Sequence, residues 1–171
     1  PTMYQFDSVG YNPDRIPDLS AVLAPPYDII DTEEQERLYH ASPHNIVRLI
    51  LGKQQPADTE QDNRYTRARR DFTAWRTEGI LRADGQPALY VVEQAFTDEA
   101  GRARSRLGFI ALLELHGASA SGVYRHEVTL DAPKQDRTRL LEAVPANLSP
   151  IFCVYPDPGG AVQALLQEAV L

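Results

Sequence analysis

The residue types best suited to chemistry gather between residues 124 and 150 of the chain. This stretch holds fixed cations, a histidine and a carboxylate, namely Arg125, His126, Glu127, Lys134 and Arg137. If a helix begins near Pro133, Lys134 and Arg137 lie one turn apart on one face, beside free backbone N–H groups at its N-terminus. Such a position binds anions or phosphates, and Glu127 or His126 could serve as a base beside the anion. The same residues are also typical of a charged helix face in solvent.

Two further groups of residues are candidates for binding a ligand. The run from Pro25 to Asp28 begins with two prolines, which fix the backbone and can aim Tyr27 and Asp28 into a cleft. A rigid loop in which Asp28 accepts a local backbone N–H explains the same residues without a ligand. Asn147 and Ser149 supply an amide and a hydroxyl near the cationic stretch, and we count them among the ligand-binding candidates.

Several classes of active site are excluded by motifs that the chain lacks. It has no Walker-type glycine loop, no Rossmann fingerprint, no nucleophile elbow and no kinase signature. Its single cysteine, Cys153, makes no internal disulfide, and it lies in an apolar run, 151–155, that predicts a buried strand and an inert thiol. No second histidine follows His126 at the zincin spacing, so we expect no metal held by protein ligands.

The composition limits the classes of partner. The chain has 171 residues, of which 43% are hydrophobic and 24% charged, values typical of a globular domain. Because the formal net charge is −7, the basic footprint of a duplex-DNA-binding protein is missing and we do not expect nucleic acid as a partner. No apolar stretch approaches the roughly 20 residues of a membrane span, and no export signal opens the chain. We therefore expect a cytoplasmic protein without a membrane partner.

Capping residues and apolar periodicity predict the helices. Asp31 can cap a first helix, with Glu34 as its capping-box partner. Thr59 is a good cap for the longest helix, which Gly79 closes. The buried stripe of that helix is predicted to hold Tyr65, Ala68, Phe72 and Trp75 or Ala74. The predicted helices cover residues 31–41, 60–78, 134–144 and 161–170.

The remaining apolar runs predict strands. They cover residues 3–9, 45–51 and 151–155, and a hairpin of 88–97 and 102–116. In the hairpin turn, 98–101, Gly101 can take a positive φ. Apolar residues on both faces of the second hairpin strand predict that its middle is buried on both sides. Because strict βαβ alternation is missing, we predict an α+β fold, a mixed β-sheet with flanking helices, in a single domain over residues 1–171.

Five segments of the chain resemble the bacterial and archaeal family known as domain of unknown function 1015. They are Ala-Pro-Pro-Tyr-Asp-Ile-Ile at 24–30, and the runs at 87–91, 125–129, 134–137 and 146–152. Members of the family are substantially longer than this chain. The resemblance therefore implies that residues 1–171 are the N-terminal part of a longer protein, with the C-terminal remainder as a partner.

The resemblance also implies a chemistry. The downstream half of the family carries an Asp-Gly-His-His-Arg motif that resembles the ParB/sulfiredoxin-like fold, whose members include free-serine kinases. This implies phosphoryl transfer to or from a small metabolite such as serine, with ATP or ADP and Mg²⁺. Glu127 or Asp28 would accept the substrate hydroxyl proton, and Lys134 and Arg137 would hold phosphate charge. Further ligand contacts are expected from Arg125, Tyr27, Asn147 and Ser149.

Three functions thus remain open at the level of the sequence. The first is a nucleotide-dependent phosphotransferase, whose site this chain would supply only in part, so that the chain alone is expected to be inactive. The second is a ParB-like nucleic-acid-associated regulatory module, against which the net charge of −7 counts. The third is a non-catalytic ligand-sensing domain in which the cationic stretch is structural.

Overall fold

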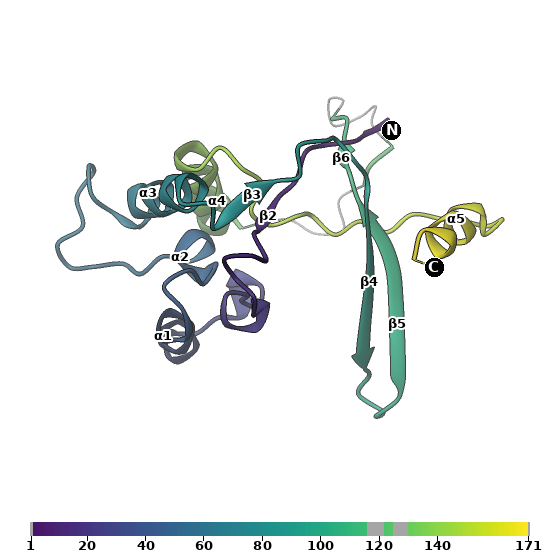
Figure 1. Ribbon diagram of the computed structural model, residues 1–171, viewed down its shortest axis with the longest axis horizontal. Coiled ribbons are helices and arrows are strands. Elements are labelled where there is room, and N and C mark those ends of the chain that lie inside the picture. The colour runs from purple at the N-terminus through teal and green to yellow at the C-terminus, as the bar shows by residue number, and fades with distance from the viewer. Residues whose placement is uncertain (1, 116–121, 125–129, 171) are drawn as a thin grey trace. The chain divides into compact units, whose positions relative to one another are not determined.

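The computed structural model describes residues 2–115, 122–124 and 130–170 (Figure 1). The chain divides into two compact units. The helical unit comprises residues 9–83 and 125–150, and the hairpin unit comprises residues 1–8, 84–124 and 151–171. The single domain expected over the whole chain stays a prediction.

Helices dominate the described part of the helical unit. They are α1 (Thr32–Ala41), α2 (Val47–Ile50), α3 (Arg64–Thr77) and α4 (Asp131–Ala143), with 3₁₀ turns η1 (Leu19–Ala21) and η2 (Tyr27–Ile29). One antiparallel pair of short strands, β2 (Val9–Tyr11) and β3 (Leu81–Ala83), completes it. The helices α3 and α4 pack against one another, and α2 packs on α3.

Helix α1 confirms the prediction made from its cap. The Asp31 side chain accepts the backbone N–H of Glu34 at 2.8 Å, and the helix ends at Ala41. Acidic residues in the first turn suit the positive end of the helix dipole. The carboxylate of Glu34 binds Arg37 instead of reaching back, so only one half of the expected capping box forms in the described residues.

Helix α3 begins later than predicted, because a different residue caps it. The Asn63 side chain accepts the N–H groups of Tyr65 and Thr66, and the Thr66 hydroxyl accepts the N–H of Asn63 at 2.9 Å. Thr59, the expected cap, accepts the N–H of Asp62 in the preceding turn. The reciprocal bonds at Asn63 satisfy two orphan donors, and so fix the start of the helix there. Gly79, at φ +72°, closes it as expected.

The strand predicted over residues 45–51 is wrong, since this run forms the single helical turn α2. The buried side chain of Asn45 holds the start of the turn. Its carbonyl oxygen accepts the backbone N–H of Val47, and its NH₂ group donates to the backbone carbonyls of Ala21 and Leu23. Val47, Leu49 and Ile50 are buried, so the apolar residues of this short turn show no clear helical period. Short apolar runs of this kind do not distinguish a buried strand from a buried helical turn.

One apolar core holds the helical unit together. Its buried members are Ile16, Val22, Leu49, Ala68, Trp75, Ile80, Leu81, Leu140 and Val144. The stripe predicted for α3 is confirmed, because Ala68 and Trp75 are buried while Tyr65 and Phe72 pack against this core. Core residues on α3 and β3 thereby pack against α4, which carries the predicted ligand residues Lys134 and Arg137.

The hairpin unit is built on two long strands. β4 (Tyr90–Thr97) and β5 (Ala103–Ile110) pair antiparallel, from Tyr90 opposite Ile110 to Thr97 opposite Ala103. Gly101 lies at φ +74° in the turn, which confirms the predicted hairpin. The second strand ends at Ile110 rather than at residue 116. After it, β6 (Leu112–Leu113) pairs with β1 (Met3–Tyr4), so the strand expected over 3–9 is divided between β1 and β2.

The prediction that β5 is buried on both sides is wrong. Residues 107–110 are half-buried, and no residue of β4 or β5 is buried. Helix α5 (Ala161–Val170) has the predicted bounds and contributes the buried Leu166. The helix lies near both hairpin strands, but it covers them only in part.

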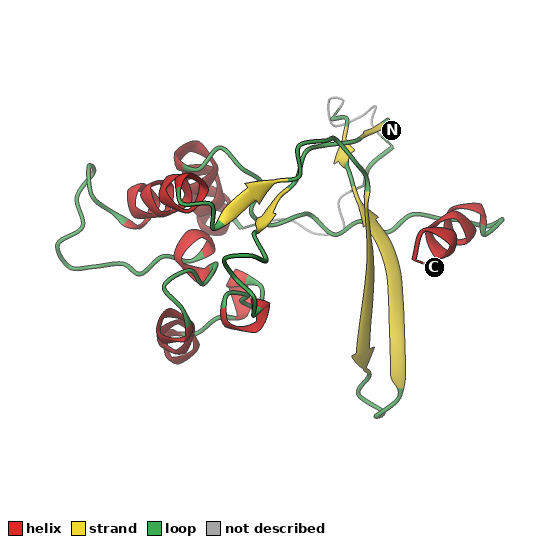
Figure 2. Ribbon diagram, viewed as in Figure 1, coloured by secondary structure: helices red, strands yellow, loops and turns green. Residues whose placement is uncertain are grey.

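The buried strand predicted over residues 151–155 is also wrong. These residues form a loop (Figure 2), and their backbone makes no hydrogen bond in the described part of the chain. Their side chains are exposed, and so is Cys153, which was expected to be a core thiol. The run has residue types that are enriched in strands, but its backbone pairs with no strand in the described part of the chain.

The α+β class is confirmed, with helices and small sheets in one chain (Figure 2). The sheet differs from the expected mixed one. Among the described residues the strands form three separate two-stranded antiparallel pairs: β1 with β6, β2 with β3, and β4 with β5. No helix in the described ranges is long and apolar enough to cross a bilayer. The expected cytoplasmic location remains a prediction.

Candidate functional site

Two of the sequence motifs meet in the helical unit. Arg137 lies on α4, and Tyr27 is the first residue of η2. The guanidinium carbon of Arg137 lies 3.9 Å from the centre of the Tyr27 ring. The Tyr27 side chain is half-buried, and the two residues are far apart in the sequence. A cation held this close to an aromatic face is favourable by about 0.5 to 2 kcal/mol. The contact therefore joins two of the predicted ligand-binding residues.

The rest of the Arg137 guanidinium is also occupied. Its Nη1 donates to the backbone carbonyl of Ile50 at 2.9 Å, and its Nε donates to Asp136 at 2.9 Å. The Nη2 atom donates to the same carboxylate. Arg137 thus binds the end of α2, its own helix and the η2 loop at once. It is placed to orient α4 rather than to offer a free charge to a ligand.

Asp136 is the centre of this group of charges. Its carboxylate accepts from the Tyr65 hydroxyl at 2.6 Å and from the guanidinium of Arg64, both on α3. Burial alone would raise the pKa of Asp136. The hydrogen bonds from Tyr65 and Arg137, together with the charges of Arg137 and Arg64, outweigh burial and lower the pKa. The carboxylate therefore stays ionised and links α3 to α4.

Local sequence explains how these side chains are brought together. Pro26 precedes η2 in an extended conformation and makes Tyr27 the first residue of the turn. Both peptide bonds of the Ala24-Pro25-Pro26 run are trans. On the other side, the cap at Asn63 starts α3 so that Arg64 and Tyr65 fall in its first turn. We name the group formed by Tyr27, Arg64, Tyr65, Asp136 and Arg137 the Asp136 cluster.

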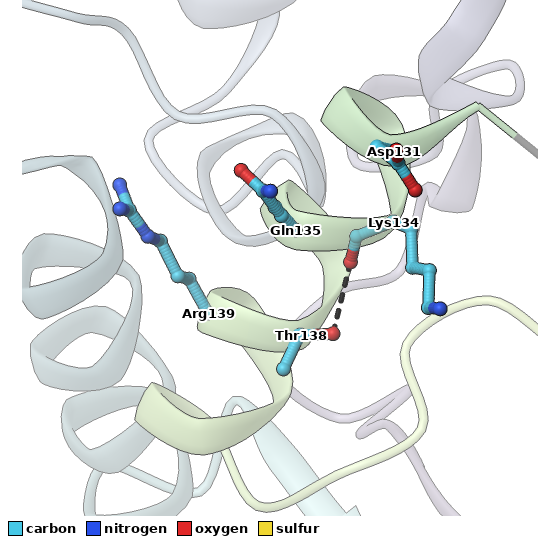
Figure 3. Close-up of a pocket in the computed structure, with 5 residues that line it drawn as sticks. All are labelled: Asp131, Lys134, Gln135, Thr138 and Arg139. Carbon is cyan, nitrogen blue, oxygen red and sulfur yellow. Dashed lines mark hydrogen bonds between the residues drawn. The ribbon is translucent and has the colours of Figure 1, made fainter.

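A second group of side chains lines an open hollow on α4 (Figure 3). Its residues are Asp131, Lys134, Gln135, Thr138 and Arg139. Lys134 and Asp131 extend to one side of the helix and Arg139 to the other, while the Thr138 hydroxyl donates to the Lys134 carbonyl at 2.9 Å. Lys134 is exposed, and its ammonium makes no ion pair in the described ranges. Arg137 does not line this hollow.

The start of α4 differs from the one expected. The helix begins at Asp131, and Leu130, its N-cap residue, provides no side-chain cap. The N–H of Lys134 donates to the Leu130 carbonyl, and Pro133 has no N–H. The prediction that Lys134 and Arg137 lie beside free N–H groups is therefore wrong, because the helix begins earlier and the N–H of Lys134 is already bonded. The N–H groups left without helical partners belong to Asp131 and Ala132.

The other predicted residues are not brought into either group. Asp28 is exposed in η2, and Asn147 and Ser149 are exposed beyond α4. None of these three side chains makes a hydrogen bond with the described residues. Arg125, His126 and Glu127 lie outside the described residues.

Three members of the Asp136 cluster were missed as functional candidates. Asp136 stands between two predicted ligand residues in the sequence, but an acid there indicated only a charged helix face. Tyr65 is predicted for the apolar stripe of its helix, and Arg64 is not among the predicted site residues. The sequence signal that could have indicated this cluster is the neighbouring pair Arg64 and Tyr65 at the start of α3. Its meaning depends on α4, which is more than sixty residues away.

The described residues define the class of the protein as α+β, with a polar cluster between two helices and a cationic hollow on one of them. Within those ranges no three His, Cys, Asp or Glu side chains gather as metal ligands. The chain belongs to the family described as Protein of unknown function (DUF1015), whose model matches residues 3–171. No curated protein and no solved structure matches the chain.

Proposed function

We propose that this chain supplies a phosphate-binding site at the first turns of α4, and that the site serves phosphoryl transfer to or from a small metabolite such as serine. The observation that carries the proposal is the ammonium of Lys134, which lines the hollow and pairs with no acid among the described residues. It lies in the second turn of a helix whose first amides have no side-chain cap. A helix N-terminus and a neighbouring cation both favour a bound phosphate.

The Asp136 cluster supports this proposal by holding α4 in place. Arg137 binds the carbonyl of Ile50 and stacks on Tyr27, while Asp136 binds α3. We assign Arg137 as a positioning residue rather than a phosphate ligand, because its donors are already engaged. Phosphoryl transfer depends mainly on positioning and electrostatic stabilisation, so a rigid α4 serves it directly.

The proton-handling group in this proposal precedes α4 in the sequence. Glu127, or His126 beside it, would accept the proton of a substrate hydroxyl, and the exposed Asp28 is the alternative carboxylate. Arg125, Asn147 and Ser149 are proposed as further contacts to the ligand. These roles rest on the residue types and on the resemblance noted above.

ATP or ADP with Mg²⁺ is the proposed phosphate donor or acceptor. In this proposal the metal arrives on the nucleotide rather than being held by a set of protein ligands. Mg²⁺ commonly keeps its waters and binds phosphates together with one or two carboxylates. Asp131, beside Lys134 in the hollow, would be such a carboxylate. When bound, the ion would supply neutralisation of phosphate charge.

The test follows phosphoserine by ³¹P NMR in the protein that carries this chain, with Mg²⁺, L-serine and ATP or ADP. We expect a phosphoserine signal, a loss of about 10²-fold or more in Glu127→Gln, and a clear loss in Lys134→Met. Lys53→Met is the matched control, because Lys53 is the other lysine and is paired with Glu36. Absence of the signal in both directions of the reaction would refute serine chemistry.

A ligand-sensing role without catalysis is the second candidate. It is favoured because Arg137 and Tyr27, both predicted to bind the ligand, contact each other and the protein instead. Binding without turnover would raise the melting temperature with nucleotide, since a ligand that binds only the folded state stabilises it. Stabilisation that Lys134→Met removes, in the absence of any phosphoserine, would select this second function.

A further inference from the structure

The segment Ile151–Tyr155 of the hairpin unit is uncharged, apolar and open to solvent. The exposed fractions are 89% for Ile151, 66% for Phe152 and 86% for Val154, and Cys153 is exposed as well. Apart from the cysteine, every residue belongs to the types enriched in strands. The backbone N–H and C=O groups of the segment make no hydrogen bond in the described ranges. Such a backbone is a template for pairing with another strand.

Side chains hold this segment near β5 without pairing its backbone. The guanidinium carbon of Arg106 lies 4.8 Å from the centre of the Phe152 ring. The rings of Tyr155 and Phe109 lie 5.9 Å apart. These two contacts restrict the segment near both of its ends. Less conformational entropy is therefore lost when its backbone pairs with a partner.

The flanking prolines restrict how the segment can pair. Pro150 and Pro156 lack an N–H, so a ladder can use only the residues between them. In a strand, alternate residues direct their N–H and C=O groups to the same edge. The edge formed by Ile151, Cys153 and Tyr155 has all its donors. The opposite edge carries both prolines, so the first edge is the one suited to pairing.

The segment is complementary to itself in one antiparallel register. With Cys153 opposite Cys153 of a second copy, Ile151 lies opposite Tyr155 and Phe152 lies opposite Val154. Each of these cross-strand pairs joins an aromatic residue to a β-branched one, a combination that stabilises sheets. No residue from 150 to 156 is charged, and Asp157 lies beyond the segment, so no like charges meet within the ladder.

We propose that residues 151–155 pair with the same segment of a second copy of this chain, antiparallel about a two-fold axis at Cys153. The result is a homodimer with an isologous interface, in which each copy presents the same surface. The paired segments also bring together the apolar side chains that each copy leaves exposed. This proposal is independent of the phosphate site on α4.

The first test measures the mass of the protein in solution by sedimentation equilibrium. We expect a reversible dimer over a range of about 5 to 200 μM, because a short ladder gives modest affinity. The shortest bifunctional methanethiosulfonate should join the two Cys153 thiols within that dimer. A monomer throughout this range, or a dimer in which Cys153 is not crosslinked, overturns the proposal.

Charges placed on the two-fold axis give the sharper test. Cys153→Asp and Cys153→Lys each put like charges opposite one another and should weaken the dimer by about tenfold or more. An equal mixture of the two variants should form a heterodimer. Cys153→Ser is the neutral control, and Leu165→Asp places the same charge on an exposed residue of α5. Equal effects of Cys153→Asp and Leu165→Asp, or no recovery on mixing, overturn the register.

Discussion

Of the buried apolar residues in the described chain, all but Leu166 belong to the helical unit. The hairpin unit instead carries most of the large apolar side chains that remain exposed, including Phe96, Leu115 and Phe152. The helical unit thus has a core of its own, while the hairpin unit relies on a ladder of backbone hydrogen bonds. Because a two-stranded hairpin is marginal by itself in water, the hairpin unit is the part of this chain that gains most from a partner.

The largest expected effect tests the core of the helical unit. Trp75→Ala removes a ring that is 4% exposed and that packs against Tyr11 and His44. We expect the free energy of unfolding to fall by about 3 to 5 kcal/mol, because a large cavity remains. Phe96→Ala, on the exposed part of β4, is the matched control and should cost much less. Similar losses in urea denaturation would show that the two units do not differ in this way.

A second change tests the small core of the hairpin unit. Leu166 is buried on α5, whereas its neighbour Leu165 is 66% exposed. Leu166→Ala should lower the stability of this unit by about 2 to 3 kcal/mol, and Leu165→Ala by less than about 0.5 kcal/mol. Amide hydrogen exchange in β4 and β5 measures both. An unchanged exchange rate in Leu166→Ala would remove this residue from the packing of the hairpin unit.

A third change tests the Asp136 cluster through its pH dependence. Asp136→Asn should destabilise the helical unit by about 1 to 2 kcal/mol at neutral pH, less than for a fully buried pair because the carboxyl group retains some exposure. The pKa of Asp136 is lowered in the folded protein. Its contribution is therefore present above about pH 4 and is lost as the pH falls through the folded value. The difference in unfolding free energy between the unsubstituted protein and Asp136→Asn should therefore disappear in acid. A difference that does not change with pH contradicts the role assigned to the Asp136 carboxylate.

The smallest expected effect concerns the start of α3. Asn63→Ala should cost about 1 kcal/mol, because Asn63 accepts two backbone N–H groups and Thr66 returns a bond to it. Thr59→Ala removes only the bond to Asp62 in the preceding turn and should cost less. Thermal unfolding of both variants measures the difference. The reverse order would restore Thr59 as the effective cap.

Local signals were sufficient for several elements. The cap at Asp31, the turn at Gly101 and the bounds of α5 were all predicted, because each depends on residues close together in the sequence. The errors at residues 45–51 and 151–155 have a shared origin. Both runs are apolar, and only the surroundings decide whether such a run becomes a buried turn, a strand or an exposed loop.

The candidate site divides in the same way. The sequence by itself determined which residue types are available: the cations of the 134–137 run, the Tyr27 motif and a net charge that disfavours nucleic acid. The tertiary structure alone decided that Arg137 stacks on Tyr27, that Asp136 joins α3, and that Lys134 lines the hollow on α4. These contacts join residues far apart in the chain, and their partners depend on how the core aligns the helices. No spacing within one segment contains that information.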